Sequence, residues 1–161
     1  TALADPPGVD TRHVESASGM LNAILAACEG ADAVIMAAAV ADYTPTNPAA
    51  DKVKKSATDE LSVQLTKTTD ILLATPRSLV RVGFAAESAN LIAYARAKLE
   101  AKALDFIVAN DITVPESGFG ADNNKVSIVS HEGVEDLPMM PKYGVAVEIL
   151  DRVAKRFAAT G

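Results

Sequence analysis

The chain has 161 residues and a formal net charge of −6, and 49% of its residues are hydrophobic while only 4% are aromatic. This length suits a single domain with a sizeable core, and the acidic balance argues against binding to nucleic acid or to an anionic membrane surface. No stretch approaches the roughly 18 continuous apolar residues of a membrane span, and no signal peptide is visible. We therefore expect a cytoplasmic protein whose Ala-, Val-, Ile- and Leu-rich core is typical of helices packed on a parallel sheet.

The amino-terminal part is predicted to contain a loop, a short strand and a helix. Residues 1–9 show neither a helical nor a strand pattern and lack a starting Met, so we expect the chain to have been cut from a longer protein. A short strand is predicted over residues 10–14. Ser16 or Ser18 is expected to cap a helix over residues 20–28. The single cysteine in this helix is expected to be a small buried hydrophobe.

A buried strand and a short helix are predicted next. Residues 33–39 read AVIMAAA, a small apolar run that predicts a buried strand. After a Pro-rich loop and a group of lysines, residues 61–65 alternate as a half-buried strand would. Asp70 is expected to cap a short helix over residues 71–74, which Pro76 ends.

The second half of the chain alternates strands and helices. Strands are predicted over residues 79–85, 105–109 and 125–130, with 134–137 returning as a hairpin, and helices over residues 88–104 and 142–158. This alternation predicts an α/β fold with a doubly wound, Rossmann-like, mostly parallel sheet and a carboxyl-terminal hairpin and helix. No linker or internal repeat indicates a second domain, so residues 1–161 are predicted to form one domain.

A strand that ends in an acid and leads to a lysine cluster organises the sequence. Asp42 follows the apolar strand, and Lys52, Lys54 and Lys55 follow the Pro-rich loop. Because ligands of open α/β sheets bind outside the carboxyl ends of the strands, Asp42 predicts a site at that edge. A KxKK sequence by itself is more often a solvated charged loop. Its place after this strand favours a role in binding an anion.

A second pair of lysines lies on the strongest predicted helix. Tyr94, Lys98 and Lys102 are spaced by four residues and share one helix face. Placed above the sheet edge, the lysines would reach a phosphate as point charges. Tyr94 and Lys98 also match the YxxxK pattern of NAD(P)-dependent short-chain reductases, an alternative that the absence of a GxGxxG motif weakens. The single cysteine and the two histidines do not show the spacing of metal ligands. The sequence therefore does not identify a metal site.

Five blocks of sequence, taken in order, resemble a known enzyme family. They are AAAVADY with the later KVKK, then TDIL, VGFAAES, YARAK with the lysine that follows it, and VANDI with the later DNN. They run from about Val34 to about Asn124. Together they resemble bacterial phosphopantothenate–cysteine ligase. In most bacteria that ligase is the carboxyl-terminal domain of a bifunctional coenzyme A biosynthesis protein, whose other domain is a flavin-dependent decarboxylase.

The resemblance implies a dimeric Rossmann-like enzyme that uses CTP and Mg²⁺. The carboxylate of 4′-phosphopantothenate would be activated as an acyl-cytidylate, with release of pyrophosphate. The amine of L-cysteine would then attack this mixed anhydride and release CMP, giving phosphopantothenoylcysteine. Such chemistry requires polyphosphate charge to be neutralised during transfer.

The resemblance also assigns roles to residues of this chain. Lys52 would be the catalytic loop lysine that neutralises phosphate or orients the acyl-cytidylate, with Lys54 and Lys55 on the rim of the site. Asp42 would contact the cytidine, and Phe84 would pack on the cytosine. The remaining nucleotide contacts would be Ala38, Ala39, Thr69, Asp70, Ile71, Leu72, Lys98 and Lys102, while Asn110 and Asp111 would shape the same rim.

One feature of the resembled family is absent from this chain. The family begins with a glycine-rich strand, turn and helix, and an asparagine there holds the acyl-cytidylate. No such stretch is present in the sequence. The chain is therefore expected to bind the cytidine nucleotide without full ligase activity. The alternative function is a catalytically incomplete nucleotide-binding or dimerising fragment of that enzyme.

Overall fold

The fold is built on a five-stranded sheet. In the computed structural model, which describes residues 4–49, 51–53, 61–117 and 120–160, the strand order is β1-β4-β5-β7-β8. The strands β1 (Ala33–Met36), β4 (Val80–Glu87) and β5 (Phe106–Asp111) run parallel, and β7 (Val126–Ser130) and β8 (Val134–Asp136) extend the sheet as an antiparallel hairpin. The predicted α/β class, with a parallel centre and a carboxyl-terminal hairpin, is confirmed.

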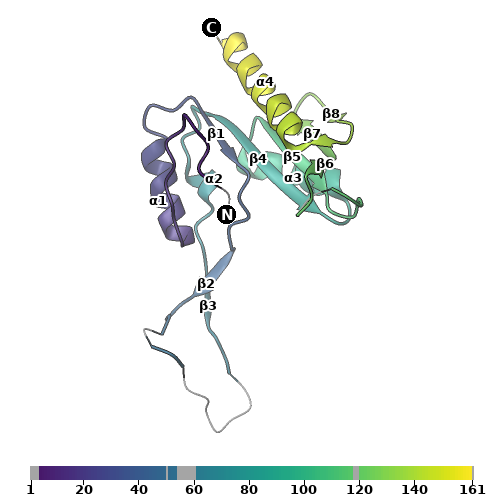
Figure 1. Cartoon of the computed structure of the whole chain (residues 1–161). Helices are drawn as coiled ribbons and strands as arrows, with labels where there is room; N and C mark the ends of the chain where they lie inside the picture. Colours follow the sequence, from purple (N-terminus) through teal and green to yellow (C-terminus); the bar gives the residue numbers. More distant parts are fainter. Residues whose placement is uncertain (1–3, 50, 54–60, 118–119, 161) are drawn as a thin grey trace.

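Helices cover both faces of this sheet, which explains the continuous apolar runs in its central strands (Figure 1). On one face, α4 (Lys142–Thr160) packs in a cluster that contains Phe106 and Val108. On the other face, α3 (Leu91–Lys102) packs in a cluster that contains Ile107. Successive residues of a strand point to opposite faces, so the strand register decides which helix each side chain meets.

The two remaining helices begin at the caps that the sequence predicts. The Ser16 hydroxyl accepts a hydrogen bond from the Gly19 N–H at 3.0 Å, at the start of α1 (Ala17–Ala27). The Asp70 carboxylate accepts from the Leu73 N–H at 3.2 Å, at the start of α2 (Ile71–Ala74). Among the residues that the structure describes, no helix is long and apolar enough to cross a membrane.

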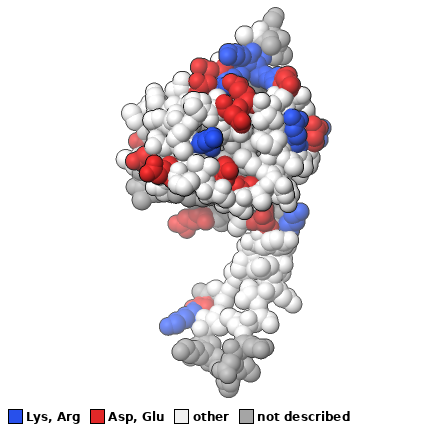
Figure 2. Space-filling view, turned by 90° about the vertical axis from the view of Figure 1, so that its right-hand side faces the viewer, with Lys and Arg blue, Asp and Glu red and all other residues white. Residues whose placement is uncertain are grey.

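A thin arm leaves the body of the molecule after β1. It is a ladder of β2 (Tyr43–Pro45) and antiparallel β3 (Leu65–Lys67), extended by a 2.6 Å hydrogen bond between the hydroxyls of Thr46 and Thr66. Every residue of the two strands is exposed. Figure 1 shows the arm projecting away from the sheet, and Figure 2 shows few charged side chains on the described part of the arm.

Several local predictions were wrong. Residues 10–14 form no strand, because their side chains are exposed and no strand of the described chain pairs with them. Residues 61–64 precede β3 without joining it, because their alternating pattern has no sheet surface on which to pack. The first strand ends at Met36, three residues early. Cys28 is half-buried rather than buried, since α1 contains no fully buried residue. The sequence also gave no sign of the short ladder between β6 (Asn123–Asn124) and β9 (Met140–Pro141).

Candidate functional site

A cavity of about 700 Å³ lies at the carboxyl ends of the three parallel strands. Ligands of open α/β sheets bind at this edge, and a cavity of this size suits a cofactor or nucleotide. It collects most of the site residues that the sequence predicts, from stretches far apart in the chain: Ala38, Ala39, Asp42, Thr69, Asp70, Ile71, Leu72, Phe84, Lys98, Lys102 and Asn110.

The cavity has two chemically different sides. Phe84 and Asn110 lie on the sheet face that α4 covers, as the packing of Phe84 with the α4 cluster and the alternation along β5 require. Lys98 and Lys102 come from α3 on the other face, and Asp70 precedes α2, which packs there as well. An aromatic and an amide therefore line one side of the sheet edge, while charged groups line the other.

Gly83 allows the charged side to pack closely against β4. A Cβ atom at this position would lie 2.7 Å from Leu104 Cδ1 and 3.4 Å from Leu72 Cδ1. The first distance is shorter than real contacts allow, so an added Cβ would force Leu104, which follows α3, to shift, whereas the distance to Leu72 is an ordinary contact. Leu104 therefore makes the close approach to the backbone beside Phe84.

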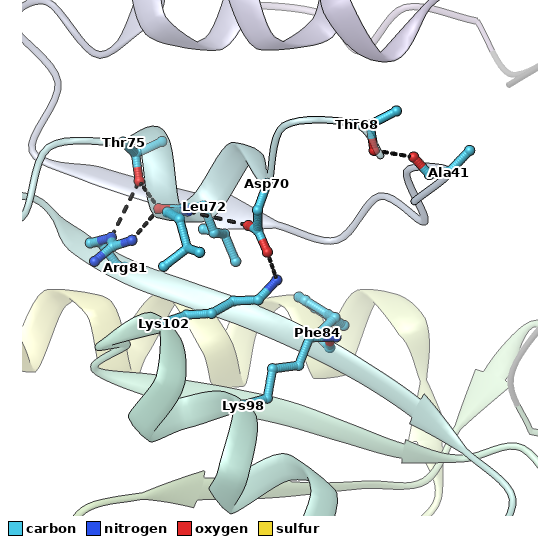
Figure 3. A network of polar contacts seen from close by, with 10 residues as sticks. Ala41, Thr68, Asp70, Leu72, Thr75, Arg81, Phe84, Lys98 and Lys102 are labelled. Carbon is cyan, nitrogen blue, oxygen red and sulfur yellow. Dashed lines mark hydrogen bonds and ion pairs between the residues drawn. The ribbon is translucent and has the colours of Figure 1, made fainter. Parts of the chain in front are cut away.

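The two lysines of α3 already have partners in the protein (Figure 3). Lys98 Nζ donates to the carbonyl of Phe84 at 3.0 Å. Lys102 Nζ lies 2.6 Å from Asp70 Oδ2. Burial lowers the pKa of Lys98, and the neighbouring Lys102 lowers it further. Both ammonium groups are thus held at the cavity wall in a fixed arrangement.

Asp70 has two tasks at the amino end of α2. It caps the helix through Leu73 and pairs with Lys102. Burial raises the pKa of Asp70, but the hydrogen bonds from Lys102 and from the backbone outweigh burial and hold the pKa below its ordinary value. The carboxylate is therefore charged at neutral pH, and it fixes the Lys102 ammonium.

Asn110 and Asp111, at the end of β5, differ in whether their side chains can bind a ligand in the cavity. Asn110 is 8% exposed, and within the described chain its Oδ1 atom is buried without a hydrogen-bond partner. Such an orphaned acceptor is costly, and a ligand donor in the cavity would satisfy it. Asp111 does not line the cavity. Its Oδ1 accepts from the Thr113 N–H at 2.9 Å and from the Thr113 hydroxyl at 2.6 Å, and these bonds lower its pKa.

The arm is tied to the cavity at its root. Asp42 lines the cavity, and its carbonyl accepts from the Thr68 N–H at 2.8 Å, while the Thr68 hydroxyl donates to the carbonyl of Ala41 at 2.6 Å. Lys52 lies further along the arm, where it is exposed and does not line the cavity. The remaining lysines of the cluster, Lys54 and Lys55, lie outside the described residues.

Several cavity residues were missed by the sequence reasoning. Glu87 ends β4, two residues beyond the predicted end of that strand, and its place at a strand's carboxyl end is the signal that could have found it. Asn124 belongs to the DNN block but was given no role. Lys142, Val145, Ala146 and Ile149 come from α4. These α4 residues reach the cavity only through tertiary packing, which no local pattern reports.

The YxxxK pair does not converge on this cavity. Lys98 lines it, but Tyr94 does not and is 54% exposed. This placement gives no support to the reductase alternative. Among the described residues, no group of three or more His, Cys, Asp or Glu side chains is arranged to hold a metal ion.

Comparisons with known proteins agree on one family. Residues 1–157 match the profile of the DNA/pantothenate metabolism flavoprotein C-terminal domain. The chain is 42% identical to the coenzyme A biosynthesis bifunctional protein CoaBC of Bacillus subtilis, over 99% of this chain and 40% of that protein. It is 38% identical to CoaBC of Escherichia coli, over 97% of this chain and 40% of that protein. The chain therefore spans about two fifths of the length of these relatives.

Solved structures show the same fold. The crystal structure of the C-terminal domain of CoaBC has a TM-score of 0.79 and 34% identity, over 98% of this chain and 71% of that chain. The DNA/pantothenate metabolism flavoprotein from Streptococcus pneumoniae has a TM-score of 0.75 at 21% identity, over 95% of this chain and 76% of that chain, which shows the fold alone. The chain belongs to the DNA/pantothenate metabolism flavoprotein C-terminal domain family.

Proposed function

We propose that this chain carries the phosphopantothenate–cysteine ligase activity of a coenzyme A biosynthesis protein. The supporting relatives are named as bifunctional proteins of that pathway. A more distant neighbour in fold, at 19% identity and a TM-score of 0.61, is a mutant of Cab2 in complex with phosphopantothenate-cysteine. The observation that carries the proposal is the cavity itself, which brings residues from separate sequence blocks to one sheet edge. Those blocks are the ones that resemble the ligase.

In the proposed reaction, CTP activates a carboxylate. A carboxylate oxygen of 4′-phosphopantothenate attacks the α-phosphorus of CTP, and the bond to pyrophosphate breaks. The amine of L-cysteine then attacks the acyl carbon of the acyl-cytidylate, loses a proton and displaces CMP. Both steps move negative charge on phosphate oxygens, which fixed cations stabilise.

The two sides of the cavity suit the two parts of a nucleotide. On the α4 side, Phe84 offers a ring for a nucleobase, and the orphaned acceptor of Asn110 suits a nucleobase amine. On the α3 side, Lys98 and Lys102 supply positive charge for phosphates. Asp42, at the root of the arm, is proposed to hold the cytidine. Ala38, Ala39 and residues 69–72 are proposed to complete the nucleotide contacts.

Lys52 is proposed to act from the arm rather than from the cavity wall. Its exposed ammonium lies on the segment that follows β2, so it would reach the reacting phosphate or acyl group when the arm closes over bound substrate. Lys54 and Lys55 are proposed to lie on the same rim. The arm would then supply the catalytic charge, while the cavity supplies binding.

Mg²⁺ is proposed to enter with the nucleotide. The described residues offer single carboxylates at the cavity, such as Asp42 and Glu87, rather than a cluster of three or more ligands. Mg²⁺ is commonly bound through one or two carboxylates and substrate phosphates, so this donor set fits a Mg–CTP complex. The ion would neutralise charge on the departing pyrophosphate.

Ligand-induced stabilisation and product release test this function. CTP should raise the melting temperature of the full-length protein more than ATP or NADPH at equal concentration, because a ligand that binds only the folded state stabilises it. With 4′-phosphopantothenate, CTP and Mg²⁺, the protein should then release pyrophosphate. Stabilisation by NADPH alone would contradict the proposal. CTP binding by this chain without pyrophosphate release would instead identify it as the incomplete nucleotide-binding fragment.

The assembly of the protein is part of the same proposal. We expect a cytoplasmic homodimer. We also expect its polypeptide to carry a flavin-dependent decarboxylase domain, since the relatives are named as bifunctional proteins and the family as a flavoprotein. Intact mass and flavin absorbance of the protein from its native source measure the fusion, and light scattering measures the dimer. A flavin-free monomer would contradict both the fusion and the dimer.

A further inference from the structure

Arg81 is a buried cation that the proposed chemistry does not use. It lies in β4 and is only 2% exposed. Alternation along β4 places its side chain on the same face as Gly83, toward α2 and α3. Burial lowers its pKa, and the nearby Arg77 lowers it further, but an arginine stays charged at neutral pH. A buried charge of this kind is kept only where it is well paired.

The guanidinium binds the carboxyl ends of two helices. Its Nη2 donates to the carbonyl of Leu72 and its Nε to the Thr75 hydroxyl at 3.2 Å, and both acceptors lie at the end of α2 (Figure 3). Its Nη1 donates to the carbonyl of Ala103 at 3.2 Å, at the end of α3. The last carbonyls of a helix lack partners within it and carry partial negative charge, so they suit a cation.

These two helices carry the two halves of the charged pair at the cavity. α2 begins immediately after Asp70, and α3 ends at Lys102, next to the Ala103 carbonyl that Arg81 holds. The Thr75 hydroxyl adds a 2.8 Å bond to the Leu72 carbonyl, so the end of α2 is fixed twice. One planar side chain therefore links both elements on which the 2.6 Å contact between Lys102 and Asp70 depends.

We propose that Arg81 is a positioning residue that holds α2 and α3 in register, and thereby places the Lys102 ammonium for the phosphates of the nucleotide. The inference rests on the proposed function, because it assigns the placed ammonium to a nucleotide substrate. Arg81 itself touches no substrate. A lysine cannot replace it fully, since a single ammonium lacks the rigid fork that reaches two helices.

A double-mutant cycle in the full-length protein tests the inference. Arg81→Met should lower kcat/KM for CTP roughly ten- to hundredfold, because small displacements of a positioned group are costly. In the Lys102→Met background the same change should cost less than about threefold, because no ammonium is left to misplace. Equal losses in both backgrounds would overturn the proposal, since a merely structural arginine acts additively. Arg77→Met removes a neighbouring exposed charge and should leave kcat/KM unchanged.

If Arg81→Met does not fold, the milder substitution Thr75→Val and a measurement made without nucleotide still test the inference. Thr75→Val removes one anchor of α2 and should raise the KM for CTP with little change in kcat, whereas Thr75→Ser should restore the wild-type KM. An unchanged KM in Thr75→Val would contradict the inference.

NMR titration of Asp70 needs no nucleotide. The pKa of Asp70 should lie below the ordinary carboxyl value in the wild-type protein and return toward that value in Arg81→Lys. An Asp70 pKa that does not respond would overturn the positioning role. Absence of CTP turnover in wild type would instead overturn the proposed function and leave this readout intact.

Discussion

A single carboxylate, Asp70, shows how one side chain joins helix formation to the chemistry of the cavity. It caps α2 and pairs with Lys102 at 2.6 Å, and its pKa is held below the ordinary value despite burial. The helix cap and the ion pair with Lys102 both use the charged form of the Asp70 carboxylate. Both should therefore weaken together when the carboxylate is protonated.

Asp70→Asn tests this coupling through the pH dependence of stability. Asparagine is itself a good cap, so the main loss is the ion pair, and we expect destabilisation of about 1–2 kcal/mol at pH 7. Because the folded-state pKa is lowered, the stabilisation is full above the unfolded pKa of about 3.9 and is lost as pH falls through the folded pKa. Urea unfolding at pH 7 and pH 3 should show the difference between wild type and variant shrinking in acid. A difference that stays constant or grows would contradict this assignment.

Asn110→Leu tests whether the orphaned amide oxygen serves a ligand. Replacing a buried, unpartnered acceptor with an apolar group of similar size should raise the free energy of unfolding by about 1 kcal/mol without ligand. The same change should weaken CTP binding by about tenfold, because the acceptor for the nucleobase amine is gone. Calorimetric titration and urea unfolding measure the two effects. Unchanged CTP affinity would exclude Asn110 from the site.

Elements with strong local signals were the ones that the sequence predicted well. Ser16 and Asp70 cap helices because their side chains satisfy nearby N–H groups, which needs no tertiary information. The central strands are apolar because helices cover both faces. The strands β2 and β3 escaped prediction because they are short and wholly exposed, so burial leaves no pattern in them.

Gly83 offers a test of how tightly these elements pack. Gly83→Ala should destabilise the fold by roughly 1–3 kcal/mol, because the new Cβ would lie 2.7 Å from Leu104 Cδ1. Adding Leu104→Val should recover part of that loss, which thermal unfolding measures. Gly144→Ala is the matched control. That position is helical and faces the flexible Met140 side chain, so the change should be neutral or stabilising. An equal loss at both glycines would point to backbone conformation rather than packing.

For the molecule as a whole, the sequence predicted which residues gather at the cavity better than it predicted how their elements pack around it. Strand-end reasoning drew attention to Asp42, charge clustering and helix spacing drew attention to the lysines, and the family resemblance supplied Phe84. Neither could distinguish Asn110 from Asp111, because only the strand register decides which side chain lines the cavity. The α4 residues were invisible for the same reason, since their contribution depends on how a distant helix packs.

Lys52→Gln tests whether the arm supplies a catalytic charge while the cavity in the body of the molecule binds the substrates. The residue is exposed, so the melting temperature should stay unchanged. Turnover of the full-length protein should fall about 10²-fold or more, as expected when a charge that stabilises a transition state is lost. Lys155→Gln, on the exposed surface of α4, should keep both turnover and stability. Normal turnover in Lys52→Gln would remove this lysine from the mechanism.

The placement of Phe84 and Asn110 on one sheet face and of the lysines on the other has an evolutionary consequence. Under the proposed function, substitutions on the α4 side would change which nucleobase is accepted while the cations of α3 stay in place. Substitutions on the α3 side would act on the phosphates that all nucleoside triphosphates share. Nucleotide preference should therefore drift readily among descendants of this fold, without an inactive intermediate. A single-residue insertion in β4 before Phe84 would turn that ring toward the α3 face, while Asn110 on β5 and the lysines on α3 would keep their places.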